Sequence, residues 1–153
     1  PYLLDRLIDD STTSGEGLRM SLSVDQLKDT VVRDLESLLN TRRGLAAGRV
    51  DAHPLAKASV LCYGLEDFSS LSMSGSNDRD LICRRLESAI GSHEPRLKRV
   101  QVTLDVKASS SQQLRFSIRA LLCVNPLREP VDFDAVLNAT TQQYAVHATR
   151  PAR

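Results

Sequence analysis

The stretch LKRVQVTLDV, residues 97–106, alternates apolar and polar side chains with a period of two. An extended strand with this pattern buries one face against a core and shows the other to water. Such half-buried strands are typical of an antiparallel sheet that is covered on one face only. The side chains that we expect to point inward are Val100, Val102, Leu104 and Val106.

The same alternation continues after three serines at 109–111, which predict a turn. A second strand follows, and Pro126 and Pro130 are expected to bracket the next loop. A final pair of strands is predicted over 133–140 and 143–149. The inward residues of the second strand are expected to be Leu114, Phe116, Ile118, Ala120 and Leu122.

Upstream of residue 97 the apolar period is helical. Ser23 and Gln26 form a capping box, with Leu22 and Leu27 as a hydrophobic staple, so a helix is predicted from there to about Asn40. A second helix is predicted to start at 77 or 78 and to end near Gly91. The predicted apolar faces are Leu27, Val31, Leu35, Leu38 and Leu39 in the first helix, and Ile82, Leu86, Ala89 and Ile90 in the second.

Residues 59–64 lie between these helices and predict a short buried strand or extended run that ends at a glycine. Helices come first along the chain and strands follow. The predicted class is therefore α+β, with helices packed on one face of a three- to four-stranded, mainly antiparallel sheet. A chain of 153 residues suits one such domain, which we expect to span 18–153.

Residues 1–17 are predicted to be an N-terminal arm followed by a flexible, polar linker. The arm is apolar, and it either folds back on its own core or docks on a neighbouring subunit. Its candidate partner-binding residues are Leu3, Leu4, Arg6 and Leu7.

Composition favours protein partners over other ligands. The net charge is only +1 and Trp is absent, which counts against nucleic-acid binding, because that binding needs basic residues for the phosphates and aromatic rings for base stacking. The three cysteines have no ligand-like spacing, and the three histidines are scattered. No phosphate loop, dinucleotide motif or nucleophile elbow is present, so we expect no catalytic residue, no metal and no cofactor. The cysteines are interpreted as reduced thiols of a cytosolic protein, and no run is long and apolar enough for a membrane span.

The junction between the second helix and the first strand holds the tripeptide Glu94-Pro95-Arg96. The proline ends the helix and makes a rigid corner, from which both charged side chains are expected to point outward. The corner is either a helix stop with an incidental ion pair or a partner-binding site. Arg42 and Arg43, just past the first helix, are likewise either a terminal charge pair or a partner-binding pair.

The tripeptide resembles the EPR motif of the gp25-like family, the wedge proteins of contractile phage tails and type VI secretion baseplates. Three other blocks, in matching order, resemble the TssE group of that family, and together the four blocks span nearly the whole chain. Cys62 departs from the pattern, where Asn is expected, and His93 stands where the family often has an aromatic. The three blocks are 3–10, 33–43 and 59–67.

This resemblance implies a structural baseplate subunit that joins the wedge proteins TssF and TssG. It also implies that the subunit starts the sheath of TssB and TssC, in the cytoplasm, at a baseplate docked on the inner membrane. Sheath subunits interlock by strand donation, and residues 131–149 are our candidate acceptor edge. The EPR corner would then hold the core bundle of the wedge through Glu94 and Arg96.

Two other functions are weighed against this one. A lysozyme-like muramidase would use Glu94 as general acid with a second carboxylate across the substrate, but Arg96 beside it favours the ionised form. An adaptor of the same fold would bind a regulatory protein instead of a baseplate, and the match of the N-terminal arm argues against it.

Overall fold

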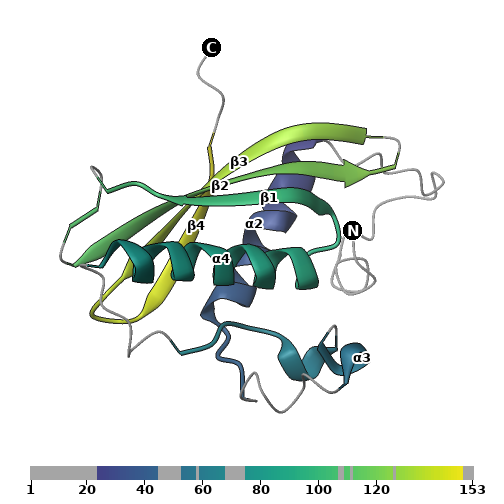
Figure 1. Ribbon diagram of the computed structural model, residues 1–153. Helices are drawn as coiled ribbons and strands as arrows, with labels where there is room; N and C mark the ends of the chain where they lie inside the picture. The colour runs from purple at the N-terminus through teal and green to yellow at the C-terminus, as the bar shows by residue number, and fades with distance from the viewer. Residues whose placement is uncertain are drawn as a thin grey trace, which may run out of the picture.

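The computed structural model describes residues 24–44, 53–57, 59–67, 75–106, 109–110, 112–125 and 127–149. Over these residues two long helices, α2 (Val24–Asn40) and α4 (Ser76–His93), lie against a four-stranded antiparallel sheet (Figure 1). Its strands are adjacent in chain order: β1 (Leu97–Leu104), β2 (Gln113–Val124), β3 (Leu127–Asn138) and β4 (Gln143–Ala148). The predicted α+β class is confirmed.

Both helices form close to where the sequence predicts them. The five apolar residues predicted for the first helix are all buried on α2. Its predicted cap and staple begin at Ser23 and Leu22, which lie outside the described residues. Helix α4 starts at Ser76, slightly earlier than predicted, and Gly75 before it makes no side-chain cap. On its apolar face Ile82, Leu86 and Ile90 are buried and Ala89 packs at the margin.

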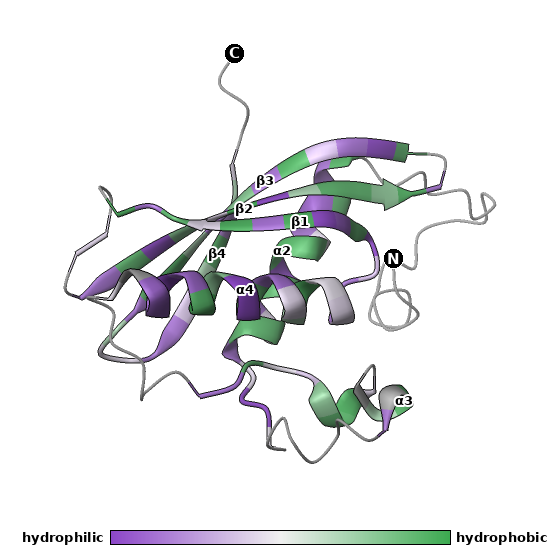
Figure 2. Ribbon diagram, viewed as in Figure 1, coloured by the Kyte–Doolittle hydropathy of each residue, from purple (hydrophilic) through white to green (hydrophobic). Residues whose placement is uncertain are grey.

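The helices cover one face of the sheet, as predicted. All five residues predicted to point inward from the second strand are buried on β2. Figure 2 shows the resulting alternation of apolar and polar residues along the strands. The core therefore lies between this face of the sheet and the two helices, and it is built of Leu, Val, Ile and a few aromatic side chains.

A bulge interrupts the alternation in β1. Its register with β2 shifts between Lys98 and Gln101, and Arg99 has a φ of 53°. The irregularity lets Leu97 and Val102 both reach the core although five positions separate them. Val100 and Leu104 pack partly against the core, as predicted. The inward position predicted for Val106 is wrong, because this residue lies past the strand and is exposed.

Strand β3 begins earlier than predicted, and Pro130 lies inside it instead of bracketing a loop. Pro130 pairs with Leu121 of β2, but β4 accompanies β3 only from Phe133 onward. The Thr149 N–H donates to the Asp132 carbonyl (2.9 Å), so the backbone of alternate β3 residues, Pro130 among them, faces the β4 side. The proline thus places its missing N–H where β4 is absent, which is why the strand tolerates it.

The buried strand predicted at 59–64 is wrong. The chain forms a short helix, α3 (Pro54–Lys57), and then a 3₁₀ turn, η2 (Val60–Cys62), capped by the Ser59 hydroxyl. Successive side chains of a helical turn point in different directions, so Cys62 is buried while Val60 is 82% exposed.

The segment after η2 is tied to the end of α2. Leu65 N–H donates to the Thr41 carbonyl, and Arg43 N–H donates to the Leu65 carbonyl, both at 2.8 Å. Gly64 makes this approach possible with a φ of +104°, and a Cβ atom there would collide with the Thr41 carbonyl. The predicted end of this segment at a glycine therefore has a structural basis.

Candidate functional site: the corner between α4 and β1

The EPR tripeptide forms the helix stop that the sequence predicts. The Glu94 N–H makes the last helical bond, to the Ile90 carbonyl (2.8 Å), and Glu94 itself has non-helical dihedral angles of −116° and 85°. Pro95 imposes this departure on the residue before it. The Leu97 N–H then returns to the Glu94 carbonyl (3.1 Å), so the chain turns within three residues and enters β1.

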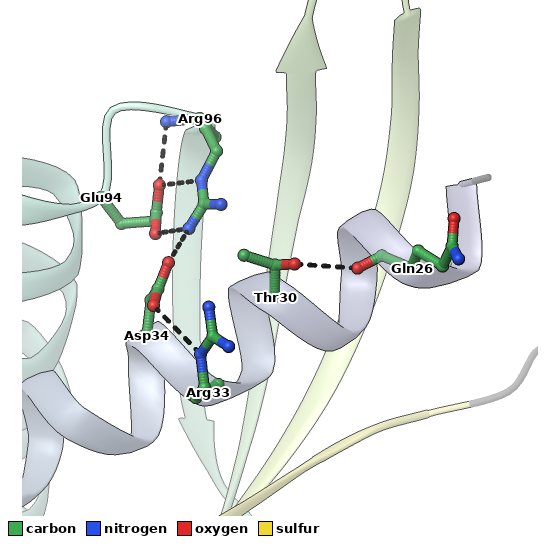
Figure 3. Close-up of polar contacts among 6 residues, drawn as sticks. All are labelled: Gln26, Thr30, Arg33, Asp34, Glu94 and Arg96. Atoms are coloured by element: carbon green, nitrogen blue, oxygen red, sulfur yellow. Dashed lines mark hydrogen bonds and ion pairs between the residues drawn. The ribbon is translucent and has the colours of Figure 1, made fainter. Parts of the chain in front are cut away.

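The two charged side chains of the corner fold inward, which corrects our prediction that both point outward. The Glu94 side chain is 4% exposed and that of Arg96 is 13% exposed. The Arg96 Nε donates to Glu94 Oε1 (2.7 Å) and its Nη2 contacts Glu94 Oε2 (Figure 3). The Arg96 backbone N–H also donates to Glu94 Oε1 (3.2 Å). Of the tripeptide, Pro95 is the exposed member.

A third side chain completes this arrangement. Arg96 Nη2 also donates to Asp34 Oδ2 (2.7 Å), and Asp34 comes from α2 (Figure 3). Asp34 is about one third exposed and lies 3.8 Å from the Nε atom of the more exposed Arg33. We call Asp34, Glu94 and Arg96 the corner clamp.

Sequence reasoning missed the role of Asp34, because nothing local links it to residues sixty positions later. The one signal is its place in the helix. It lies three residues after buried Val31 and four before buried Leu38, so it borders the apolar stripe. A charged residue at that position needs a partner near the core, and Arg96 provides it.

The clamp joins three elements through one guanidinium. Two carboxylates share Arg96, with charge-assisted hydrogen bonds in a largely desolvated place. Removing one member of such a group leaves the others buried without compensation, which is more costly than the net gain from forming it. The arrangement therefore fixes the corner against α2.

The second candidate pair, Arg42 and Arg43, is divided between surface and interior. Arg43 is mostly buried and contacts Glu66 (3.4 Å), which also binds Arg85 (3.0 Å). These three residues line a shallow pocket of about 240 Å³ with His93, whose Nε2 lies 2.9 Å from the Cys62 carbonyl. Arg42 is exposed and donates to Gln142 Oε1 (2.8 Å). The arm candidates Leu3, Leu4, Arg6 and Leu7 lie outside the described residues.

Helix α4 closes the outer edge of β1 with two side chains. The Val102 N–H donates to Glu87 Oε1 (2.8 Å). Burial raises the pKa of the Cys83 thiol, and a hydrogen bond from the Leu104 backbone opposes this shift. Four residues along a helix and two along a strand each span about 6 Å, so Cys83 and Glu87 match Leu104 and Val102.

The other outer edge, predicted within 131–149 to be open for strand donation, is closed in its middle. Asn40 at the end of α2 binds both backbone groups of Tyr144 in β4. Val146, the next residue that turns its backbone outward, is 2% exposed. The described part of 131–149 does include an edge strand, β4, but the backbone groups of Tyr144 and Val146 on that edge are already engaged or covered.

The fold and the corner define a small helix-backed sheet whose charged residues tie its own elements together. Among the described residues no group of His, Cys, Asp and Glu could hold a metal ion, and no helix could cross a bilayer. The model of one family, baseplate wedge protein gp25, matches residues 25–127, about two thirds of the chain. The chain belongs to this family, which supports a structural role in a baseplate. No curated protein matches the chain.

Proposed function

We propose that this chain is the small wedge subunit of a type VI secretion baseplate, of the TssE group. It joins TssF and TssG and starts polymerisation of the TssB and TssC sheath, in the cytoplasm at a baseplate docked on the inner membrane. The family match over 25–127 carries the baseplate role. The secretion-system part rests on the sequence blocks at 3–10, 33–43 and 59–67, which resemble the TssE group.

The corner keeps its proposed partner-binding role in a changed form. Glu94 and Arg96 are held inside the clamp, so we assign to them the task of fixing the backbone at Pro95. A rigid, exposed proline at a sharp turn offers a preformed contact, and preformed contacts lose little conformational entropy on binding. A partner then contacts Pro95 and the residues around it, while Glu94 and Arg96 hold the backbone in place without touching the partner.

Strand exchange with the sheath is proposed at the edge within 131–149, on two conditions. The Asn40 amide occupies Tyr144, so a strand added along the middle of β4 has to displace it. The added strand also has to uncover Val146, the next residue of β4 that turns its backbone outward. The edge of β1 is less accessible, because α4 itself lies beside it.

The function is tested in cells that carry the secretion machine but lack this chain. We expect no sheath to form, as seen with fluorescent TssB, and recovery when the chain is supplied. Purified chain should also co-elute with a TssF–TssG complex. Normal sheath assembly in cells without the chain contradicts the proposal, and so does failure to bind TssF–TssG.

The muramidase alternative gains a second carboxylate from the structure but loses access. Asp34 lies near Glu94, as that mechanism requires, yet Arg96 binds both acids. The Glu94 side chain is buried, and neither Glu94 nor Asp34 lines the pocket beside Arg43 and His93 or the pocket beside Cys83 and Glu87. Clearing of a peptidoglycan suspension that is lost on Glu94→Gln would reverse this conclusion.

The adaptor alternative is separated from the baseplate role by its partners. A pull-down with the full chain from the native lysate should recover TssF and TssG. Recovery of a regulatory protein in their place would favour the adaptor.

A further inference from the structure

The face of the sheet turned away from the helices has a distinct end next to the corner. The register places Leu121 of β2 between Lys98 of β1 and Pro130 of β3. One step further along β2, Cys123 lies opposite Arg128. Side chains alternate along a strand, and Leu122 is buried under the helices, so its two neighbours in β2 and their cross-strand partners share the opposite face.

This end carries positive charge. Lys98 and Arg128 are exposed and have no acidic partner among the described residues, and the same holds for Arg99 in the neighbouring bulge. Two acids of the adjoining strand β3 contact other cations. Glu129 binds Lys28 of α2 (2.7 Å), and Asp132 lies 3.7 Å from Arg119 one row away.

The middle of the same end is apolar. Leu121 and Cys123 are half-buried and Pro130 is exposed. We call the six residues Lys98, Arg99, Leu121, Cys123, Arg128 and Pro130 the basic end. An apolar centre with a charged rim is the usual anatomy of a protein interface.

The basic end is attached to the corner by a direct bond. The Cys123 N–H donates to the Arg96 carbonyl (2.7 Å), so the end of strand β2 is bonded to the residue that the clamp fixes. Lys98 follows Arg96 by two residues in β1, and exposed Pro95 precedes Arg96. The corner and the basic end therefore belong to one rigid part of the molecule.

We propose that the basic end binds an acidic, partly apolar protein segment of a wedge partner, next to Pro95. This inference rests on the proposed function and names the chemistry of its partner. Three cations without described acidic partners favour an acidic segment, and the half-buried Leu121 and Cys123 favour apolar contacts beside it. No aromatic residue lies in the basic end, so stacking of nucleic-acid bases has no platform there.

The test compares two charge reversals of equal size with purified TssF–TssG. The first variant combines Lys98→Glu and Arg128→Glu in the basic end. The control combines Arg84→Glu and Arg115→Glu, which are exposed cations also without described acidic partners, on α4 and near the start of β2. We expect affinity at least tenfold weaker in the first variant, slower association and a reduced dependence on salt, and near-native behaviour in the control.

A third variant, Leu121→Ser, removes apolar surface without changing charge. We expect it to weaken binding several-fold mainly through faster dissociation, because apolar contact at the centre of an interface acts on the lifetime of the complex. All variants are first compared with the native chain in thermal unfolding.

The outcomes separate this inference from the function on which it rests. If the native chain fails to bind TssF–TssG, the proposed function is overturned. If the native chain binds and both charge reversals bind equally well, the basic end is not the docking surface. The inference would also be overturned if the Lys98→Glu/Arg128→Glu variant kept its affinity for TssF–TssG but lost a binding to phosphatidylglycerol vesicles or to DNA that the native chain shows.

Discussion

The side-chain amide of Asn40 makes the two hydrogen bonds to Tyr144 that a residue on a neighbouring strand would make. Its Nδ2 donates to the Tyr144 carbonyl and its Oδ1 accepts from the Tyr144 N–H, both at 2.8 Å. A pair of residues in an antiparallel ladder exchanges the same two bonds. The last residue of a helix therefore takes the place of a strand at the edge of the sheet.

Replacing Asn40 by Ala should lower the free energy of unfolding by about 1–3 kcal/mol, because both backbone groups of buried Tyr144 lose their partner. Urea denaturation measures the change. Gln143→Ala, at an exposed neighbouring position in β4, serves as control and should stay within about 0.5 kcal/mol of the native chain. Equal stability of Asn40→Ala and the native chain would show that water replaces the amide without cost.

Breaking the corner clamp should strongly destabilise the fold. Arg96→Met leaves Glu94 buried without its cation, and such losses cost about 3–5 kcal/mol. Asp34→Asn should cost less, since Asp34 is partly exposed. A double-mutant cycle with Glu94→Gln and Arg96→Met, measured by urea denaturation, should give a coupling energy above about 1 kcal/mol, and additive effects would contradict the clamp.

Two glycines should respond in opposite directions to alanine. Gly64→Ala combines a positive φ with a collision at the Thr41 carbonyl, so we expect a loss of about 1–3 kcal/mol. Gly91 lies within α4 with open space around its Cβ position, so Gly91→Ala should stabilise the protein by about 0.5–1 kcal/mol. Melting temperatures of both variants decide, and a stable Gly64→Ala would mean that the segment after η2 can shift.

Because the phenol of Tyr144 is buried, we expect the free energy of unfolding to fall at high pH. Burial raises the pKa of Tyr144 above its usual range, although the charge of Arg42 opposes this shift. The unfolded chain releases the proton from about pH 10, whereas the folded chain keeps it. The contribution is therefore complete below pH 10 and declines above it by about 1.4 kcal/mol per pH unit.

Tyr144→Phe should remove this dependence between pH 9 and 11. At pH 7 it should be neutral or slightly stabilising, because the buried hydroxyl has no hydrogen-bond partner among the described residues. Urea denaturation across this pH range measures both effects. A large loss at pH 7 would reveal a partner for the hydroxyl.

Local patterns predicted the elements of the fold well. The helical period gave the buried face of α2, and the period of two gave that of β2, because each element buries one side against the same core. Errors arose where a pattern is short or interrupted. The apolar run at 59–64 turned out to be a single helical turn, and Pro130 proved compatible with a strand that lacks a neighbour there.

The corner shows where sequence reasoning stops. Proline fixed the backbone at Pro95 as predicted, since that effect is local. The direction of the Glu94 and Arg96 side chains depended on Asp34, which only the packing of α2 brings near. Likewise the partners of the edge strands, Asn40 and Glu87, come from helices whose positions no local pattern specifies.

The groups that occupy both borders of the sheet belong to helices, not to the sheet itself. A heated or damaged molecule that loses the last turn of α2, or shifts α4, will uncover unpaired backbone before the strands separate. The uncovered edges then associate with those of another copy, so the protein aggregates, and thermal inactivation should become faster as protein concentration rises.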